Sequence, residues 1–220
     1  LNKYQSGFRK SRNTIDQLFR LSDDIIKNFG NKSSVLGVFV DFEKAYDMVW
    51  RCGVLYKLDN LGFDGNIFNW IKAFLSERSL QVCVGASLSK SFSIENGLPQ
   101  GSVISPILFL IAINDLSPPR VKYSLFADDV ALWKSGRNVS HINRIVQESL
   151  DYLHMWCNKW GFKLSIEKTK FILFHKGKAK HVQLSFGDNE LKGANSVTFL
   201  GMVFDHKLTW RKHIRNALIF

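Results

Sequence analysis

The chain has 220 residues, which suits one large domain, or one domain and part of another. Hydrophobic residues make up 45% of the sequence and aromatic residues 13%, enough to bury a sizeable core and to exclude an intrinsically disordered chain. Lys and Arg total 30 against 19 Asp and Glu, and the resulting net charge of +11 favours a polyanionic partner such as nucleic acid.

The first half of the chain alternates helical and extended patterns. Apolar residues at helical spacing over residues 15–29 predict a first helix, which Gly30 ends. The apolar run 35–40 predicts a buried strand that leads directly into Asp41. Two short helices are expected near residues 48–60 and 65–76. A hairpin follows, with strands over 80–84 and 91–94 and its turn over 85–87.

The second half begins with a loop of helix- and strand-breaking residues, 96–101, before an apolar helix near 105–115. Strands over 121–126 and 130–133 are separated only by Ala127, Asp128 and Asp129, which predicts a tight hairpin. A long amphipathic helix is expected over 139–160, and the clearest strands of the tail are 171–174 and 197–203. This alternation predicts an α+β fold with helices packed on one face of a mostly antiparallel sheet.

Cysteine spacing and hydropathy exclude several other classes. The 3 cysteines are odd in number and lack C-x-x-C spacing, which excludes a disulfide framework or a zinc finger and fits a reducing compartment. No apolar run reaches the ~18 residues of a membrane span, so we expect no membrane partner. The chain does not begin with Met and stops within a helical pattern at 218–220, which predicts a fragment of a longer protein.

Aspartates stand at the ends of the predicted strands. Asp41 ends the buried strand, while Asp128 and Asp129 occupy the tip of the hairpin. If the two strands are neighbours in one sheet, these carboxylates converge. Clustered carboxylates suit Mg²⁺, and two such ions about 4 Å apart clamp an in-line phosphoryl transfer. The alternative for the Asp-Asp pair is a simple turn, because Asp is favoured there.

Five segments stand in order along the chain: 5–9 (QSGFR) with Arg12, 41–47 (DFEKAYD), 97–102 (GLPQGS) with 105–106, 126–129 (FADD), and 161–164 through 168–169 with 199–201. Together they are similar to the reverse transcriptases of non-LTR (LINE-type) retrotransposons. Residues 205–214 also resemble this branch, which favours it over a group II intron maturase. Tyr46 and the Ala-Asp-Asp box argue against an RNA-dependent RNA polymerase.

The resemblance implies the palm of a right-hand polymerase, with part of the fingers and without the thumb. It assigns residues 1–34 to the partial fingers with their first helix, and 206–220 to the start of the connection to the thumb. Residues 35–205 are then the palm with inserted fingers elements. Its motifs are 35–47, 97–106, 121–134, 160–175 and 197–203.

The activity implied is RNA-directed DNA polymerisation in retrotransposition, in which dNTPs are added to a DNA primer on an RNA template. The fragment alone is expected to be weakly active or inactive. By the same resemblance, Asp41 and Asp128 hold two Mg²⁺ ions, with Mn²⁺ as a substitute. Asp129 supports the site and the main-chain carbonyl of Phe42 completes it. The resemblance also places the protein inside the cell, in the nucleus or cytoplasm, as a ribonucleoprotein.

The remaining roles follow from the same motifs. The Tyr46 ring would exclude a ribonucleotide's 2′-hydroxyl, the alternative being core packing. Gln100 and Gly101 would meet the incoming nucleotide and the template, the alternative being an ordinary helix-entry turn. Lys168 would protonate the leaving pyrophosphate, the alternative being a solvated strand-edge lysine. A hairpin of Phe199, Leu200 and Gly201 would position the primer 3′ end. The alternative for Phe199 and Leu200 is packing in the hydrophobic core.

A non-enzymatic function remains open at this point. The net charge of +11 and the missing fingers and thumb also fit a nucleic-acid-binding remnant or a domesticated reverse transcriptase-like domain. Salt-dependent binding to RNA–DNA duplexes without nucleotide incorporation would distinguish it. The sequence does not specify an oligomeric state.

Overall fold

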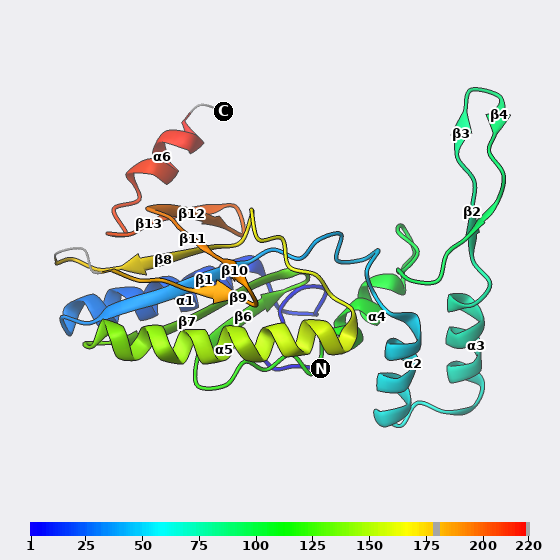
Figure 1. Cartoon of the computed structure of the whole chain (residues 1–220), viewed down its shortest axis with the longest axis horizontal. Helices are drawn as coiled ribbons and strands as arrows, with labels where there is room; N and C mark the ends of the chain where they lie inside the picture. The colour runs from blue at the N-terminus through cyan, green and yellow to red at the C-terminus, as the bar shows by residue number, and fades with distance from the viewer. Residues whose placement is uncertain (178–180, 219–220) are drawn as a thin grey trace.

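The computed structural model describes residues 1–177 and 181–218. Its centre is a five-stranded sheet in the order β11-β8-β1-β7-β6, in which only the β11–β8 pairing is parallel (Figure 1). The α+β class with a mostly antiparallel sheet is therefore confirmed. The strands of this sheet are β1 Ser34–Val40, β6 Lys122–Phe126, β7 Asp129–Gly136, β8 Lys170–Phe174 and β11 Lys192–Gly193.

Strand β1 lies in the middle of the sheet and is buried along nearly its whole length. Leu36, Val38 and Val40 join one hydrophobic core, while Val35 and Phe39 join a second one. Because successive side chains of a strand point to opposite faces, the two cores lie on opposite faces of the sheet. A strand buried on both faces reads as a continuous apolar run, which is why residues 35–40 show no alternation.

Helices cover both faces of the sheet, which differs from the one-sided packing expected (Figure 1). Helix α5 (Val139–Trp160) packs on the first core. Helix α1 (Thr14–Gly30) packs on the second, together with the hairpin of β12 (Ser196–Phe199) and β13 (Met202–Asp205). Strand β1 is apolar on both faces, so each face of the sheet needs a covering element, and the apolar stripes of α5 and α1 cover one face each.

The ends of both long helices are set by local signals. The Asn13 side chain accepts the Asp16 N–H at 2.9 Å, and the Asp16 carboxylate accepts the Asn13 N–H at 3.3 Å, forming a capping box before α1. Helix α5 begins after Asn138, whose side chain accepts the His141 N–H, and ends at Gly161 with a φ of 76°. Its bounds coincide with the predicted helix over 139–160.

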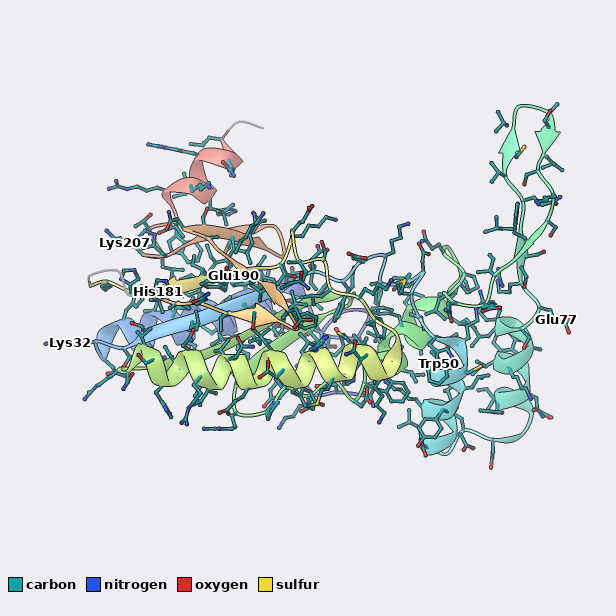
Figure 2. All side chains as sticks on the ribbon, in the orientation of Figure 1. Lys32, Trp50, Glu77, His181, Glu190 and Lys207 are labelled. Atoms are coloured by element: carbon teal, nitrogen blue, oxygen red, sulfur yellow. The ribbon has the colours of Figure 1, made fainter. Side chains whose placement is uncertain are left out.

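A second group of elements extends away from the sheet (Figure 1). Helix α4 lies between the two parts and is buried, whereas the predicted hairpin is a long ribbon whose regular pairing is limited to short pieces. Figure 2 shows the ribbon's side chains projecting into open space beyond Glu77 at its base. The elements are α2 Arg51–Asn60, α3 Gly65–Leu75, β2 Ser79–Leu80, β3 Cys83–Val84, β4 Ser87–Leu88, β5 Phe92–Ser93 and α4 Ser105–Ala112.

The tail differs from its prediction in one element. Residues 197–203 were expected to be one strand, but Leu200 (φ 48°) and Gly201 (φ 81°) form a turn between β12 and β13. A second short hairpin precedes them, and a helix follows. These elements are β9 Ser185–Phe186, β10 Asn189–Glu190 and α6 Arg211–Ala217.

The predicted domain boundaries stay predictions. Residues 219 and 220, the last of the expected connection to the thumb, lie outside the described residues. Among the residues that are described, no helix combines the length and apolar character needed to cross a membrane.

Candidate active site

The carboxylates come together where the neighbouring strands β1 and β7 meet the turn of the β6–β7 hairpin. Val40 pairs with Val130 at the end of the β1–β7 ladder, so Asp41 lies next along β1 and Asp129 next along β7. Asp129 also pairs with Phe126, which leaves Ala127 and Asp128 as the tip of the β6–β7 hairpin. Asp129 is thus part of β7 rather than of the turn. The convergence expected from neighbouring strands is present.

The charges of these carboxylates are coupled. Desolvation beside the turn of the β6–β7 hairpin, with the charges of Asp128 and Asp41, raises the pKa of Asp129. Asp129 is an exposed residue, so we attribute more of this effect to the neighbouring charges than to burial. The Asp41 side chain is 44% exposed. Carboxylates that repel one another and remain open to solvent are suited to bind a cation.

The backbone of Phe42 adds a possible third oxygen. Phe42 pairs with Leu164 across an antiparallel bridge on the β8 side of β1. In a pair of this non-hydrogen-bonded kind, the main-chain polar groups point to the opposite side, here toward β7 and the aspartates. The bonds that flank the pair run from Glu43 N–H to the Lys163 carbonyl (2.9 Å) and from Ser165 N–H to the Asp41 carbonyl (2.8 Å).

The donor set fits a hard divalent cation that keeps other ligands. Within residues 1–177 and 181–218, no three His, Cys, Asp or Glu side chains gather closely enough to hold an ion by themselves. Mg²⁺ does not require this, because it is usually bound through one or two carboxylates plus waters and substrate phosphates. Asp41 and Asp128, with the Phe42 carbonyl, therefore fit Mg²⁺ that is completed by substrate.

Lys168 and Thr169 lie against Asp41. The Lys168 Nζ is 3.9 Å from Asp41 Oδ1, and its side chain is 73% exposed. The buried Thr169 hydroxyl oxygen accepts the Asp41 N–H at 3.1 Å. Thr169 thus fixes the backbone of the strand end. Lys168 places an exposed positive charge beside the Asp41 carboxylate.

Tyr46 lies between the carboxylates and a pocket. Partial burial of the Tyr46 hydroxyl, together with the charge of Asp128, raises the pKa of this phenol. Its ring stacks on the buried Phe109 ring. The same side chain lines a pocket of about 470 Å³ with residues of the 97–106 loop. The lining residues are Phe8, Tyr46, Gln100, Gly101, Ser102, Val103, Ser105 and Pro106.

The 97–101 loop is joined to the segment that follows Asp41. Leu98 N–H donates to the Tyr46 carbonyl at 2.9 Å, and Gln100 Nε2 donates to Asp47 Oδ1 at 3.0 Å. Gly101 has a φ of 83°, a conformation that residues with a Cβ rarely adopt. The loop therefore brings Gln100 and Gly101 to the pocket that Tyr46 lines. The predicted contact of Gln100 with a nucleotide remains a prediction.

Arg51 is a residue of this site that sequence reasoning missed. Its side chain is buried, and its guanidinium donates to four main-chain carbonyls around the base of the ribbon and the loop. A charged residue at the start of a helix is usually exposed, so the sequence gives no sign that Arg51 is buried and bonded to these carbonyls. The acceptors are the carbonyls of Gly97 (2.7 Å), Leu75 (3.1 Å), Ile94 (2.7 Å) and Asn96 (2.9 Å).

The predicted primer-positioning residues form a hairpin, but one of them is core. Phe199 is 4% exposed and packs edge-on against Phe39, with ring centroids 5.4 Å apart. Its side chain therefore holds β12 on the α1 face of the sheet and does not reach a ligand. Leu200 and Gly201 form the turn and are not buried. Only these two remain candidates for contact with a primer.

Comparison with known proteins identifies the family. The profile of the reverse transcriptase (RNA-dependent DNA polymerase) family matches residues 1–204. The chain is 30% identical over 97% of its length to the RNA-directed DNA polymerase from mobile element jockey of Drosophila melanogaster. It is 30% identical over 98% of its length to the probable RNA-directed DNA polymerase from transposon BS of the same organism. It spans 24% and 25% of these two relatives.

Solved structures share the fold. Telomerase from Candida tropicalis in complex with a TWJ fragment of telomeric RNA aligns with a TM-score of 0.64 and 14% identity, covering 93% of this chain and 33% of that one. Apo telomerase truncated from its C-terminal domain, from the same organism, gives 0.62 and 15%, covering 93% and 40%. The chain therefore belongs to the reverse transcriptase (RNA-dependent DNA polymerase) family, among relatives from non-LTR retrotransposons.

Proposed function

We propose that this chain is the catalytic palm of an RNA-directed DNA polymerase that acts in retrotransposition. The observation that carries the proposal is the meeting of Asp41, Asp128 and Asp129 beside the pocket lined by Tyr46 and Gln100. Nucleotidyl transfer requires charge neutralisation and substrate positioning at adjoining places. The names of the jockey and BS relatives support the same activity.

The carboxylates of Asp41 and Asp128 and the carbonyl of Phe42 would hold Mg²⁺, with Asp129 in support and Mn²⁺ as a substitute. Two bound ions supply charge stabilisation at the attacking and leaving oxygens of an in-line displacement. The template base selects the incoming nucleotide by base pairing. The protein residues therefore position the sugar and triphosphate and do not read the base.

The side chains around the pocket give each contact a physical role. The Tyr46 ring, backed by Phe109, would occupy the space of a ribose 2′-hydroxyl and so favour dNTPs. Gln100 and Gly101 would meet the incoming nucleotide and template. The exposed ammonium of Lys168, beside Asp41, would reach the leaving pyrophosphate and donate a proton to it.

The partners of the reaction are an RNA template, a DNA primer and dNTPs. The net charge of +11 supports binding to phosphate backbones. The RNA in the telomerase complex, a protein of the same fold, is consistent with an RNA partner. Leu200 and Gly201 are the candidates to contact the primer. We place the protein in the nucleus or cytoplasm as a ribonucleoprotein.

Primer extension tests the proposal. The full-length product of the native gene is assayed on poly(rA)–oligo(dT) with Mg²⁺ and dTTP, beside its Asp41→Ala and Asp128→Asn variants. We expect incorporation by the parent and background signal from both variants, with thermal unfolding temperatures no lower than that of the parent. Asp59→Asn, which changes an exposed aspartate of α2, is the matched control and should retain full activity.

The alternatives have distinct outcomes. Activity that survives in Asp128→Asn would show that this carboxylate is not a metal ligand. A folded parent that binds RNA–DNA duplexes in a salt-dependent manner, yet incorporates nothing, would favour the nucleic-acid-binding remnant. In that case the aspartates would be a relic of an ancestral enzyme.

A further inference from the structure

The turn that presents Asp128 has a backbone conformation that needs support. Ala127 and Asp128 are the only residues between the paired Phe126 and Asp129. Ala127 has a φ of 52°, in the left-handed region that a Cβ disfavours and that Gly usually occupies. Ala127 is also buried, at 8% exposure, so its polar backbone groups need partners within the protein.

One side chain bonds both polar groups of Ala127. The amide of Gln5 is 2% exposed, and its Oε1 accepts the Ala127 N–H at 3.0 Å. Its Nε2 donates to the Ala127 carbonyl at 3.4 Å. The same Oε1 accepts the Gly7 N–H at 2.7 Å, which fixes the orientation of the amide. Gln5 therefore hydrogen-bonds both the N–H and the carbonyl of Ala127, the residue directly before Asp128.

The segment that carries Gln5 runs alongside the hairpin. Gln5 forms a parallel bridge with Leu125, whose N–H donates to the Tyr4 carbonyl at 3.1 Å and whose carbonyl accepts the Ser6 N–H at 2.9 Å. Gly7 approaches so closely that a Cβ there would lie 2.3 Å from the Ala127 nitrogen. Hydrogen bonds and close packing thus independently hold this segment against the turn.

A second buried glutamine beneath the segment does not touch the turn. Gln17 is 3% exposed, and its Nε2 donates to Ser6 Oγ. Its Oε1 accepts the Ser124 hydroxyl at 2.6 Å. Gln17 therefore resembles Gln5 in residue type, in burial and in bonding two residues through its side chain. It differs in bonding the strand and not the turn.

We propose that Gln5 is a positioning residue, which holds the Ala127–Asp128 turn and so directs the Asp128 carboxylate toward Asp41. This inference rests on the proposed function, because it assigns the turn to nucleotidyl transfer. Gln5 acts through Ala127 and touches neither substrate nor cation. A change at Gln5 should therefore affect cation binding and turnover more than nucleotide affinity.

The test compares Gln5→Met with Gln17→Met in the full-length protein. Each variant keeps side-chain length and removes the side chain's hydrogen bonds to two residues, three bonds for Gln5 and two for Gln17. We expect Gln5→Met to lower kcat and Mn²⁺ affinity, the latter read by electron paramagnetic resonance, by about 10-fold or more, the effect typical of groups that support a metal site. The KM for dNTP should change by less than about 3-fold. Gln17→Met should retain kcat and Mn²⁺ affinity within about 3-fold.

A further readout and a substitute variant do not depend on catalysis. The Ala127 amide should exchange its hydrogen faster in Gln5→Met than in Gln17→Met, because Gln5 accepts that N–H. If Gln5→Met fails to fold, Gly7→Ala takes its place. This variant keeps the Gln5 side chain but forces the Ala127 backbone away from it, and it should lower Mn²⁺ affinity in the same way.

The outcomes separate this inference from the proposed function. A parent without polymerase activity removes the proposed function, while weaker Mn²⁺ binding and faster Ala127 exchange in Gln5→Met would still support the positioning role. Folded Gln5→Met with parental Mn²⁺ affinity and kcat would overturn the positioning role, as would equal losses in Gln17→Met. Parental Mn²⁺ affinity in Gly7→Ala would also overturn it.

Discussion

The ring of Tyr46 stacks on the ring of Phe109, with centroids 4.6 Å apart and planes 8° from parallel. Phe109 is fully buried in α4, so the Tyr46 ring rests on a rigid support. The Tyr46 side chain also lines the pocket that contains Gln100 and Gly101. A supported ring in a nucleotide pocket excludes bulk more effectively than a mobile one, because it cannot move aside.

Replacing Tyr46 should therefore relax sugar selection. We expect Tyr46→Ala to raise the rNTP to dNTP ratio of kcat/KM by about 10- to 100-fold, the range for loss of one steric contact in a pocket. Tyr46→Phe keeps the ring and the stack, and should discriminate as the parent does. Single-nucleotide incorporation with each triphosphate measures the ratio. Parental discrimination by Tyr46→Ala would mean that the residue only packs the core.

Asp129 should destabilise the metal-free protein at neutral pH. Desolvation and the charges of Asp128 and Asp41 raise its pKa, so the folded state holds this proton to higher pH than the unfolded state does. A raised folded pKa contributes stability below the unfolded pKa, near 3.8, and that contribution is lost as pH rises through the folded value.

Asp129→Asn removes this penalty. In EDTA at pH 7.5, we expect the variant to be more stable than the parent by about 0.5 kcal/mol, a value reduced by the solvent exposure of the group. The difference should disappear below the unfolded pKa, where both side chains are neutral. Urea denaturation at both pH values measures it. A variant that is less stable than the parent at pH 7.5 would contradict the like-charge account.

Local patterns were enough to predict much of the frame. The continuous apolar run before Asp41 predicted the buried strand, and the 139–160 periodicity predicted α5 with its observed bounds. The positions of Asp41 at the end of one predicted strand and of Asp128 in the turn beside another predicted that the two carboxylates would converge. These features depend on period and on neighbouring residues, which a single sequence contains.

Features that depend on distant partners could not be predicted in this way. The side of the sheet on which α1 packs depends on Trp133 and Phe174, which contribute to the core beneath it. The apolar pattern of 197–203 predicted one strand, and only the family resemblance placed a hairpin at 199–201, because the residue type of Leu200 does not suggest its positive φ. The burial of Arg51 depends on four carbonyls that lie 24 to 46 residues away.

Lys57 should make stability depend on alkaline pH. Its ammonium is buried, bonds Asp115 at 2.5 Å, and lies 3.7 Å from the centroid of the Trp160 ring. Burial lowers its pKa from 10.5 to about 8, although Asp115 opposes the shift. Between these two values the unfolded state binds more protons than the folded state, so stability rises with pH across this window.

Comparison with Lys57→Met isolates this contribution. From pH 7.5 to pH 10, the stability of the parent relative to the variant should rise by about 1–2 kcal/mol, less than the full shift allows. Cys157 also titrates late, because burial raises its pKa to about 12, but this effect is common to both proteins. Urea denaturation across the range provides the measurement. A constant difference would mean that Lys57 stays charged when folded.

Arg51 should support both the fold and the nucleotide loop. Its guanidinium is the buried donor shared by the carbonyl of Gly97, at the start of the loop, and by carbonyls at the base of the ribbon. Arg51→Met leaves these acceptors without that donor, and we expect a loss of about 2–4 kcal/mol in the free energy of unfolding. The KM for dNTP should rise, because Gln100 is then less firmly held at the pocket.

Arg51→Lys separates charge from geometry. A single ammonium restores the positive charge but cannot reproduce a planar fork directed at four carbonyls. We expect it to recover part of the stability and little of the KM. Arg78→Met is the control, since it removes a nearby cation whose bond to the Phe74 carbonyl is long, at 3.5 Å. If folded Arg51→Met keeps the parental KM, the guanidinium stabilises the ribbon base without positioning the loop.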